Sequence, residues 1–261
     1  MNITPIEWCD QTWNPVTGCM HGCPYCYAIK RVRRFKRGYE EIFSSRNINT
    51  LDAPGYVTTK KGKTIKNAYP FGFEPTFHRY RLEEPQYIKK PQNIFVCSMA
   101  DLFGEFIPDE WIQAVFEACE AAPQHRYLFL TKNPKRYMTL KLPLNENIMF
   151  GATITNKESP TPYYSQGGMF QSQRFISFEP LLDDIAEQYL LPIVNSAWVI
   201  IGAESGNRKD KVIPKKEWIQ NILDKCQEHN VPVFMKDSIV EIWGEPLIQE
   251  YPWENGVKNG K

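Results

Sequence analysis

Apolar runs of strand length alternate with helix-like stretches from residue 93 onward. The first run, residues 93–99 (NIFVCSM), is followed by Pro108-Asp109, a typical helix start, and then by apolar residues at helical spacing from Trp111 to Ala122. The further runs are residues 127–131, 147–154, 174–178, 197–202 and 231–235. Buried strands that alternate with helices predict a parallel sheet that is covered on its outer face.

Six or seven such units predict an α/β fold, a partial or complete (β/α) barrel of about six or seven parallel strands. Asn133-Pro134 and Pro214 are expected to open two of the helices, the second with an apolar face from Trp218 to Cys226. A doubly wound open sheet is the structural alternative. Since 261 residues can bury one sizeable core, we expect a single domain over residues 1–261.

The first third of the chain is less regular. Residues 3–16 have extended character and predict a first strand, and residues 27–43 (YAIKRVRRFKRGYEEIF) follow as a helix with no clean apolar stripe. Residues 44–92 have no clear period and mix glycines and prolines with aromatic residues. A loop of this length in a compact domain is usually functional, and we interpret it as an insertion that covers the mouth of the barrel.

Three cysteines lie between these segments, within eight residues. Cys19, Cys23 and Cys26 are set among glycines and a proline, which allow tight backbone turns. Three thiolates can bind three corners of an iron–sulfur cube, whereas a closed cluster or a structural zinc ion normally takes four protein ligands. One metal corner would then accept an outside ligand, which favours a reaction centre over a structural site.

The spacing Cys19-x3-Cys23-x2-Cys26, with Tyr25 directly before the third cysteine, resembles the signature of the radical S-adenosylmethionine (radical SAM) superfamily. The resemblance implies a [4Fe–4S] cluster whose open iron chelates S-adenosylmethionine, with an electron from an external donor cleaving the sulfonium to a 5′-deoxyadenosyl radical. The longer pattern EWCDQTWNPVTGCMHGCPYCYA, with SMADLFGEF, LFLTKNP, ISFEPLL and IIGAESG, also resembles a radical SAM-like family found in phages and bacteria. That second resemblance covers most of the chain and adds architecture rather than chemistry.

Polar side chains follow each expected strand. In parallel α/β proteins the loops at the carboxyl ends of the strands converge on the ligand, so these residues are site candidates. They are Ser98, Asp101, Thr131, Lys132, Thr153, Thr155, Glu179, Glu204, Ser205, Lys236 and Asp237. A barrel that served only as a packed core would not need carboxylates and ammonium groups at one rim, although surface loops are commonly polar.

The groups of S-adenosylmethionine suggest roles for these residues. In the radical SAM superfamily a Gly-Gly-Glu-like segment after the second strand receives the amino group, and Ser98 and Asp101 hold that position without a glycine pair. Glu179 or Glu204 would accept from the ribose hydroxyls, and Thr153 would donate to the carboxylate. The resemblance places Tyr25 beside the adenine. Lys132 and Lys236 are candidates for substrate anchoring or proton delivery, or alternatively structural ion-pair partners.

Composition narrows the class of protein. Hydrophobic residues make up 42% of the chain, charged residues 23%, and no apolar run approaches twenty residues, so we expect a soluble protein with no membrane contact. The first residues have neither a basic nor an apolar region of the signal-peptide type, which predicts a cytoplasmic location. Cytosolic thiols favour metal sites over disulfides, and Cys97, Cys119 and Cys226, within apolar patterns, are expected in the core.

The net charge of +1 hides an asymmetry, because residues 30–92 carry fifteen Lys or Arg and six Asp or Glu. Six of the eight residues 30–37 are basic, and further basic residues alternate with aromatic ones along the insertion. Nucleic-acid grooves pair phosphate charges with base stacking in this way, so a nucleotide or nucleic-acid substrate is one interpretation. A solvated helix face and an aromatic-packed insertion are the structural alternatives.

Cys9 supports a rival interpretation. As a fourth thiolate it would close the site, giving a non-catalytic, metal-stabilised protein that binds nucleic acid with zinc or a closed iron–sulfur cluster. His21, inside the cysteine loop, is expected to be exposed rather than a ligand. P-loop, G-x-G-x-x-G, H-E-x-x-H and G-x-S-x-G motifs do not occur, which leaves the cysteine loop as the strongest local signal.

Overall fold

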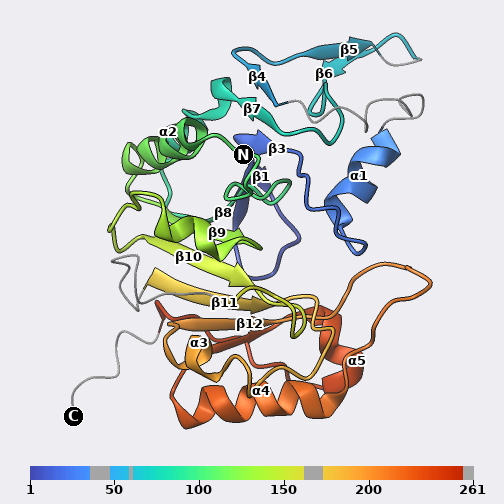
Figure 1. The fold of residues 1–261 in the computed structure, drawn as a ribbon. Helices are drawn as coiled ribbons and strands as arrows, with labels where there is room; N and C mark the ends of the chain where they lie inside the picture. The colour runs from blue at the N-terminus through green and yellow to red at the C-terminus, as the bar shows by residue number, and fades with distance from the viewer. Residues whose placement is uncertain (36–47, 59–60, 162–172, 255–261) are drawn as a thin grey trace. The chain divides into compact units, whose positions relative to one another are not determined.

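The main sheet of the computed structural model has eight strands in the order β1-β2-β8-β9-β10-β11-β12-β13 (Figure 1). The structure describes residues 1–35, 48–58, 61–161 and 173–254. The strands of this sheet are β1 Asn2–Ile3, β2 Gln11–Trp13, β8 Asn93–Val96, β9 Arg126–Thr131, β10 Ile148–Thr153, β11 Arg174–Phe178, β12 Trp198–Ile201 and β13 Val233–Met235.

The strand order identifies the sheet as barrel-like. From β2 onward the strands of this sheet follow one another in the same order as along the chain, without the reversal of order that defines a doubly wound sheet. β2 pairs with β8 in parallel, as do β10 with β11, β11 with β12 and β12 with β13, whereas β1 is antiparallel to β2. β1 and β13 end the series, so the sheet is open. The predicted α/β class with a partial barrel is confirmed, and the complete barrel and the doubly wound sheet are not found.

The strands formed where the apolar runs predicted them. All six residues of β10 and all four of β12 are buried, as expected for strands of a parallel sheet covered on both faces. The predicted and observed limits of β11 coincide at residues 174 and 178. The first strand was predicted too long, because residues 3–16 contain three short strands, β1, β2 and β3 (Val16–Thr17). Pro5 and Pro15 interrupt the extended chain there, since proline cannot donate to a ladder.

The helices are α1 Tyr27–Phe35, α2 Asp109–Glu120, α3 Leu190–Val194, α4 Lys216–Glu228 and α5 Val240–Trp243, with 3₁₀ turns η2 Arg79–Arg81, η3 Glu84–Tyr87, η4 Pro134–Met138 and η6 Asp237–Ile239. Pro108 is the N-cap of α2, which confirms its predicted start. The helix expected to open at Asn133-Pro134 does begin there, with Asn133 as its N-cap, but as the short 3₁₀ helix η4 rather than an α-helix. The predicted helix beyond residue 35 lies outside the described residues. Among the described helices, none combines the length and the apolar character that a membrane span requires.

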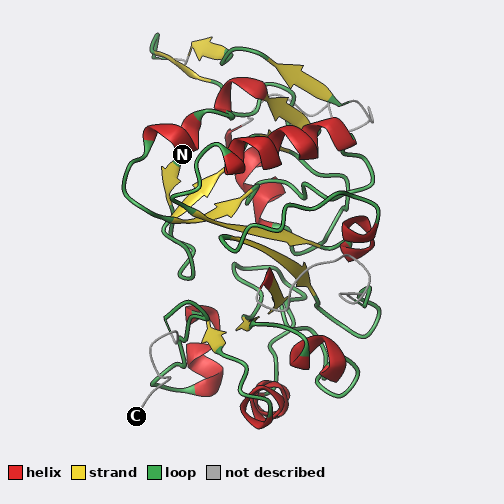
Figure 2. Ribbon diagram, turned by 90° about the vertical axis from the view of Figure 1, so that its left-hand side faces the viewer, coloured by secondary structure: helices red, strands yellow, loops and turns green. Residues whose placement is uncertain are grey.

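The chain forms two compact units. The first comprises residues 1–4 and 9–127, and the second residues 5–8 and 128–261. The first unit also holds a three-stranded sheet, β3-β7-β4, and a separate hairpin of β5 and β6, drawn as yellow arrows in Figure 2. These strands are β4 Asn49–Leu51, β5 Tyr56–Thr58, β6 Thr64–Lys66 and β7 Thr76–His78. The insertion at 44–92 is therefore more regular than expected, although its residues 44–47 and 59–60 lie outside the described part. The single domain over residues 1–261 remains a prediction. The position of the insertion over the barrel mouth also remains a prediction.

Aromatic residues fill the interior of each unit. In the first unit Phe77 stacks on Trp111 with ring centroids 5.2 Å apart. In the second unit Trp198 of β12 contacts Phe234 and Trp253 and donates from Nε1 to the Glu250 carbonyl at 2.8 Å. The three cysteines expected in the core are all buried: Cys97, Cys119 and Cys226.

We predict that buried His78 makes folding sensitive to acid. His78 Nε2 lies 2.8 Å from Thr17 Oγ1, and burial lowers the pKa of His78 from 6.5 to about 3. Between these values the unfolded chain binds a proton that the folded chain does not, so the free energy of unfolding should fall by about 1.4 kcal/mol per pH unit below pH 6.5. Urea unfolding at several pH values between 7.5 and 5 measures this slope.

The matched variants are His78→Gln and His229→Gln, the latter at an exposed histidine after α4. We expect the glutamine at position 78 to reduce the slope and the glutamine at position 229 to leave it unchanged. An equal slope in wild type and His78→Gln would contradict the assignment.

Candidate metal and cofactor site

The cysteine loop is fixed to the chain that follows β8. Gly18 donates its N–H to the Met99 carbonyl at 2.9 Å, and Cys19 donates to the Phe73 carbonyl at 3.1 Å. Gly18 has φ +86°, and a Cβ at this position would lie 2.1 Å from the Glu74 carbonyl oxygen. Only glycine fits this turn, because any side chain would both strain the backbone and collide with it. The backbone direction in which the loop leaves β3 is therefore fixed at Gly18.

The three cysteines lie together on this loop, and the third sits directly before α1. Cys26 donates its N–H to the Cys23 carbonyl at 3.1 Å, and the Ile29 N–H of the first helical turn points at Cys26 Sγ at 3.5 Å. Cys19, Cys23 and Cys26 are all partly buried. A helix N-terminus favours negative charge, so this position suits a thiolate ligand.

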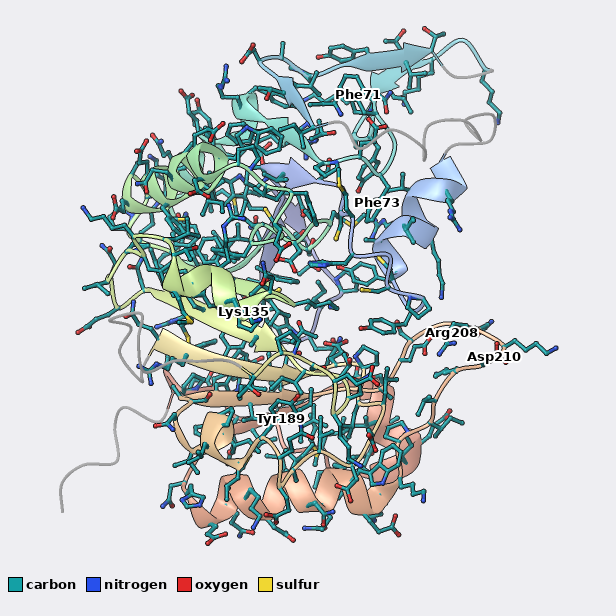
Figure 3. All side chains as sticks on the ribbon, in the orientation of Figure 1. Phe71, Phe73, Lys135, Tyr189, Arg208 and Asp210 are labelled. Carbon is teal, nitrogen blue, oxygen red and sulfur yellow. The ribbon has the colours of Figure 1, made fainter. Side chains whose placement is uncertain are left out.

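A small apolar cluster packs against the cysteine loop. Ala28 and Val32 of α1 pack with Phe73 and Met99, and Cys19 and Cys26 contact the same cluster. Phe73 lies beside α1 in Figure 3. The cluster thus holds two of the three sulfur positions against a fixed surface.

The electrostatics of the loop suit a cationic occupant. The pKa of Cys19 is raised to about 12, mainly by burial; the charges of Asp101, Cys23 and Cys26 contribute to the rise, and the backbone N–H of His21 opposes it. A thiolate at Cys19 is therefore unfavourable unless a metal compensates its charge. No three His, Cys, Asp or Glu side chains of the described ranges converge as ligands of a single metal ion. A cluster needs no such convergence, because each of its thiolates binds a different iron.

Cys9 lies away from this loop. Asp10 pairs with Asn93 through backbone and carboxylate hydrogen bonds of 2.9 and 2.7 Å, at the start of β8. From Asp10 the chain runs along β2, and the extended segment from residue 10 to residue 14 spans roughly 13 Å. It therefore ends at the carboxyl end of the paired strands β2 and β8, where Gly18 bonds to Met99. Cys9 therefore lies toward the other end of β2 from Cys19, which argues against Cys9 as a fourth ligand.

Two polar contacts connect the loop and the strand ends. Asn14, just after β2, accepts from the Ser98 hydroxyl at 3.2 Å and from the Met99 N–H at 2.9 Å through Oδ1. His21 Nε2 lies 2.8 Å from Asp101 Oδ2, and Phe103 donates its N–H to Oδ1 at 3.1 Å. The cysteine loop and residues 98–103 are thus joined across eighty positions of sequence.

In the second unit an ion-pair cluster lies at the ends of β11 and β13. Lys236 contacts Glu179 Oε1 and lies 3.6 Å from Glu7 Oε2. Burial lowers the pKa of Lys236, but the attraction of the two carboxylates outweighs it, so the pKa lies above its ordinary value. Gly202 makes room for this pair, since a Cβ there would lie 3.0 Å from Lys236 Cδ.

The other candidates of the second unit also follow strands. Glu204 is buried, and its two oxygens accept from Arg208 at 2.8 Å each; Arg208 lies on the loop after β12 (Figure 3). Thr153 is the buried last residue of β10, and Lys132 is the first residue after β9. The predicted positions at the carboxyl ends of strands are confirmed, while the roles of these residues remain predictions.

The family model "Protein of unknown function (DUF5131)" matches residues 3–250 of the chain. The chain belongs to the DUF5131 family. A search of the curated proteins found no match.

Two solved structures of spore photoproduct lyase resemble the fold of this DUF5131 chain. A cysteine-to-serine mutant has a TM-score of 0.50 and 11% identity over 90% of this chain and 78% of that chain. A double mutant described as having "bound AdoMet and dinucleoside spore photoproduct" has a TM-score of 0.50 and 10% identity over 86% and 75%. At this identity the likeness shows the fold.

The first unit brings together residues that the sequence analysis named as site candidates, namely the three cysteines, Ser98 and Asp101, and their roles remain predictions. Sequence reasoning missed the side chains that hold them, namely Asn14, His21 as the partner of Asp101, and Tyr27, whose hydroxyl donates to the Ser98 carbonyl. In the second unit it missed Glu7 as a partner of Lys236. His21 is exposed, as expected, and its place inside the cysteine motif was the available signal for its role.

We predict that the two glycines of this DUF5131 cysteine loop tolerate alanine very differently. Gly18→Ala adds backbone strain and a collision with the Glu74 carbonyl, so we expect a loss of about 3 kcal/mol or more in the free energy of unfolding. Gly22 has φ +67° but no atom within 4 Å of an added Cβ, so Gly22→Ala should cost about 1 kcal/mol. Urea unfolding of the two variants measures the difference. Equal losses would show that Gly18 is not the constrained position.

Proposed function

We propose that the chain is a radical SAM enzyme in which Cys19, Cys23 and Cys26 hold a [4Fe–4S] cluster that binds S-adenosylmethionine at its open iron. The observation that carries the proposal is the number of thiols available. Three cysteines share one loop fixed beside Met99, whereas Cys9 lies toward the opposite end of β2. A protein that supplies three ligands leaves a coordination position for the cofactor.

The residues around the loop would hold the thiolates in place. When bound, the cluster would supply an electron from an external donor for cleavage of the sulfonium and so initiate hydrogen abstraction. The Ile29 N–H would stabilise charge on Cys26, and the contact between His21 and Asp101 would hold the loop against residues 98–103.

The sequence candidates for S-adenosylmethionine can be ranked by their partners. Asp101 remains the candidate for the amino group, because its carboxylate contacts His21 of the cysteine loop and so lies beside the proposed cluster, and a carboxylate suits an ammonium group. For the ribose hydroxyls Glu179 is favoured over Glu204: it is partly exposed, whereas Arg208 already binds both oxygens of buried Glu204. Ser98, Thr153 and Tyr25 keep their proposed contacts, Tyr25 beside the adenine.

Of the two lysines, Lys132 is the better candidate for proton delivery. The carboxylates of Glu179 and Glu7 keep Lys236 protonated, because they raise its pKa above the ordinary value despite burial. Lys236 therefore suits anchoring of a carboxylate. Lys132 lies directly after β9 and is partly buried.

The substrate class rests on two weaker supports. Residues 30–92 are strongly basic, and the double mutant of spore photoproduct lyase carries both AdoMet and a dinucleoside ligand on a similar fold. We propose a nucleotide or nucleic-acid substrate.

Anaerobic reconstitution with iron and sulfide, followed by dithionite and S-adenosylmethionine, tests the function. We expect about four irons per chain and formation of 5′-deoxyadenosine by the wild type. Cys19→Ala should abolish the product, because two thiolates and the remaining loop do not hold the cluster.

Cys9→Ala is the matched control. It should retain both the iron content and the product, since Cys9 lies away from the loop. Equal loss of iron in the two variants would favour a closed site, and a cluster without 5′-deoxyadenosine would refute the enzyme assignment.

A further inference from the structure

The hairpin of β5 and β6 is exposed on all of its strand residues. Every residue of Tyr56–Thr58 and Thr64–Lys66 is exposed, including Tyr56 at 60%. An isolated two-stranded hairpin is at best marginally stable in water, because it has no core to bury. This hairpin therefore presents its side chains to solvent without building a core.

The pairing register separates the two faces of the hairpin. Tyr56 lies opposite Lys66, Val57 opposite Ile65, and Thr58 opposite Thr64. Because strand side chains alternate, Tyr56, Lys66 and the two threonines share one face, and the Thr58 and Thr64 hydroxyls lie 3.4 Å apart on it. One face thus combines an exposed aromatic ring, an ammonium group and hydroxyl donors.

The charge around the hairpin has one sign. Residues 53–73 contain four lysines and no aspartate or glutamate. Three of these lysines, Lys61, Lys63 and Lys66, are described and exposed. Exposed ammonium groups attract phosphates, and releasing the condensed counterions of a nucleic acid contributes to its affinity.

We propose that the face of Tyr56 and Lys66 binds single-stranded nucleic acid, with a base stacked on Tyr56 and phosphates held by the hairpin lysines. An exposed ring can stack only on a base that is not already stacked in a duplex. Residues 59–63, between the strands, contain no apolar side chain that would enter a bilayer, which argues against an anionic membrane as the partner. The inference deepens the proposed function by naming the substrate class and in that respect rests on it; the binding itself does not require the cluster.

Fluorescence anisotropy tests the proposal with the full chain, a labelled mixed-sequence single strand of roughly 20 nucleotides, and a duplex of the same sequence. We expect tighter binding of the single strand. Tyr56→Ala should weaken that binding by roughly 5- to 100-fold, whereas Tyr56→Phe, which keeps the ring, should stay close to wild type.

The lysines are tested through the salt dependence of binding. The variant Lys61→Gln, Lys63→Gln, Lys66→Gln should reduce the slope of log K against log salt by about 0.7 for each lost phosphate contact. The matched variant Lys135→Gln, Lys141→Gln, Lys215→Gln replaces three exposed lysines outside residues 30–92 and should leave the slope unchanged; Lys135 lies on η4 (Figure 3).

Three results would overturn the proposal: equal slopes in the two triple variants, an unchanged affinity in Tyr56→Ala, or vesicles of anionic lipid that bind more tightly than the single strand. A failure of the nucleic-acid proposal is distinguished from a failure of the radical SAM proposal by assaying the reconstituted hairpin variants for 5′-deoxyadenosine. We expect its formation to equal that of the wild type in the absence of nucleic acid, because none of the substituted residues belongs to the cysteine loop.

Discussion

The hydrogen bond from Gly18 to Met99 is the constraint on which the cysteine site depends. β2 and β8 pair in parallel, and the chains that leave them remain together because Asn14 bonds to Ser98 and Met99. The Gly18 hydrogen bond then turns the chain, so that Cys19, the first of the three cysteines, lies just beyond the ends of β2 and β8. A loop with three thiols has little intrinsic order, so its geometry must come from backbone groups already fixed by the sheet. The Cys19 and Cys26 contacts with the apolar cluster complete this support.

The two units differ in how they treat buried ionisable groups: the first disfavours a charged Cys19, and the second stabilises a charged Lys236. At Cys19, burial and the nearby Asp101 make the thiolate unfavourable without a metal, which links metal binding to order in the loop. In the second unit, Lys236 is fixed in its charged form between Glu179 and Glu7. An ion pair with these partners has its geometry fixed before any ligand arrives, because Gly202 leaves space for it and Asp237 donates its N–H to Glu7 at 3.2 Å. Such preorganised charge is useful for binding and less useful for proton transfer.

The sequence predicted elements whose cause is local. β11, β12 and the start of α2 follow from apolar runs and from Pro108, and the three cysteines follow from their spacing. The contacts that position the site join distant segments: His21 with Asp101, and Glu7 with Lys236, which is 229 positions away in the chain. No periodicity encodes such pairs. The sheet of β3, β7 and β4 was missed for a different reason: its strands of two or three residues are shorter than the window in which alternation can be recognised.

Helix α1 explains why the basic run showed no clean apolar stripe. Among the α1 residues whose side chains the structure describes, 27–33, Ala28 and Val32 are the buried ones, and the surface they cover is the small cluster with Phe73 and Met99. Arg31 and Arg33 are exposed on the remainder of the helix. The two interpretations of the charge run, a solvated face and an anion-binding surface, are therefore compatible in one helix that begins directly after Cys26. Any anion attracted to that outer face would lie on the helix that begins at the third cysteine, so local charge and metal site share one structural element.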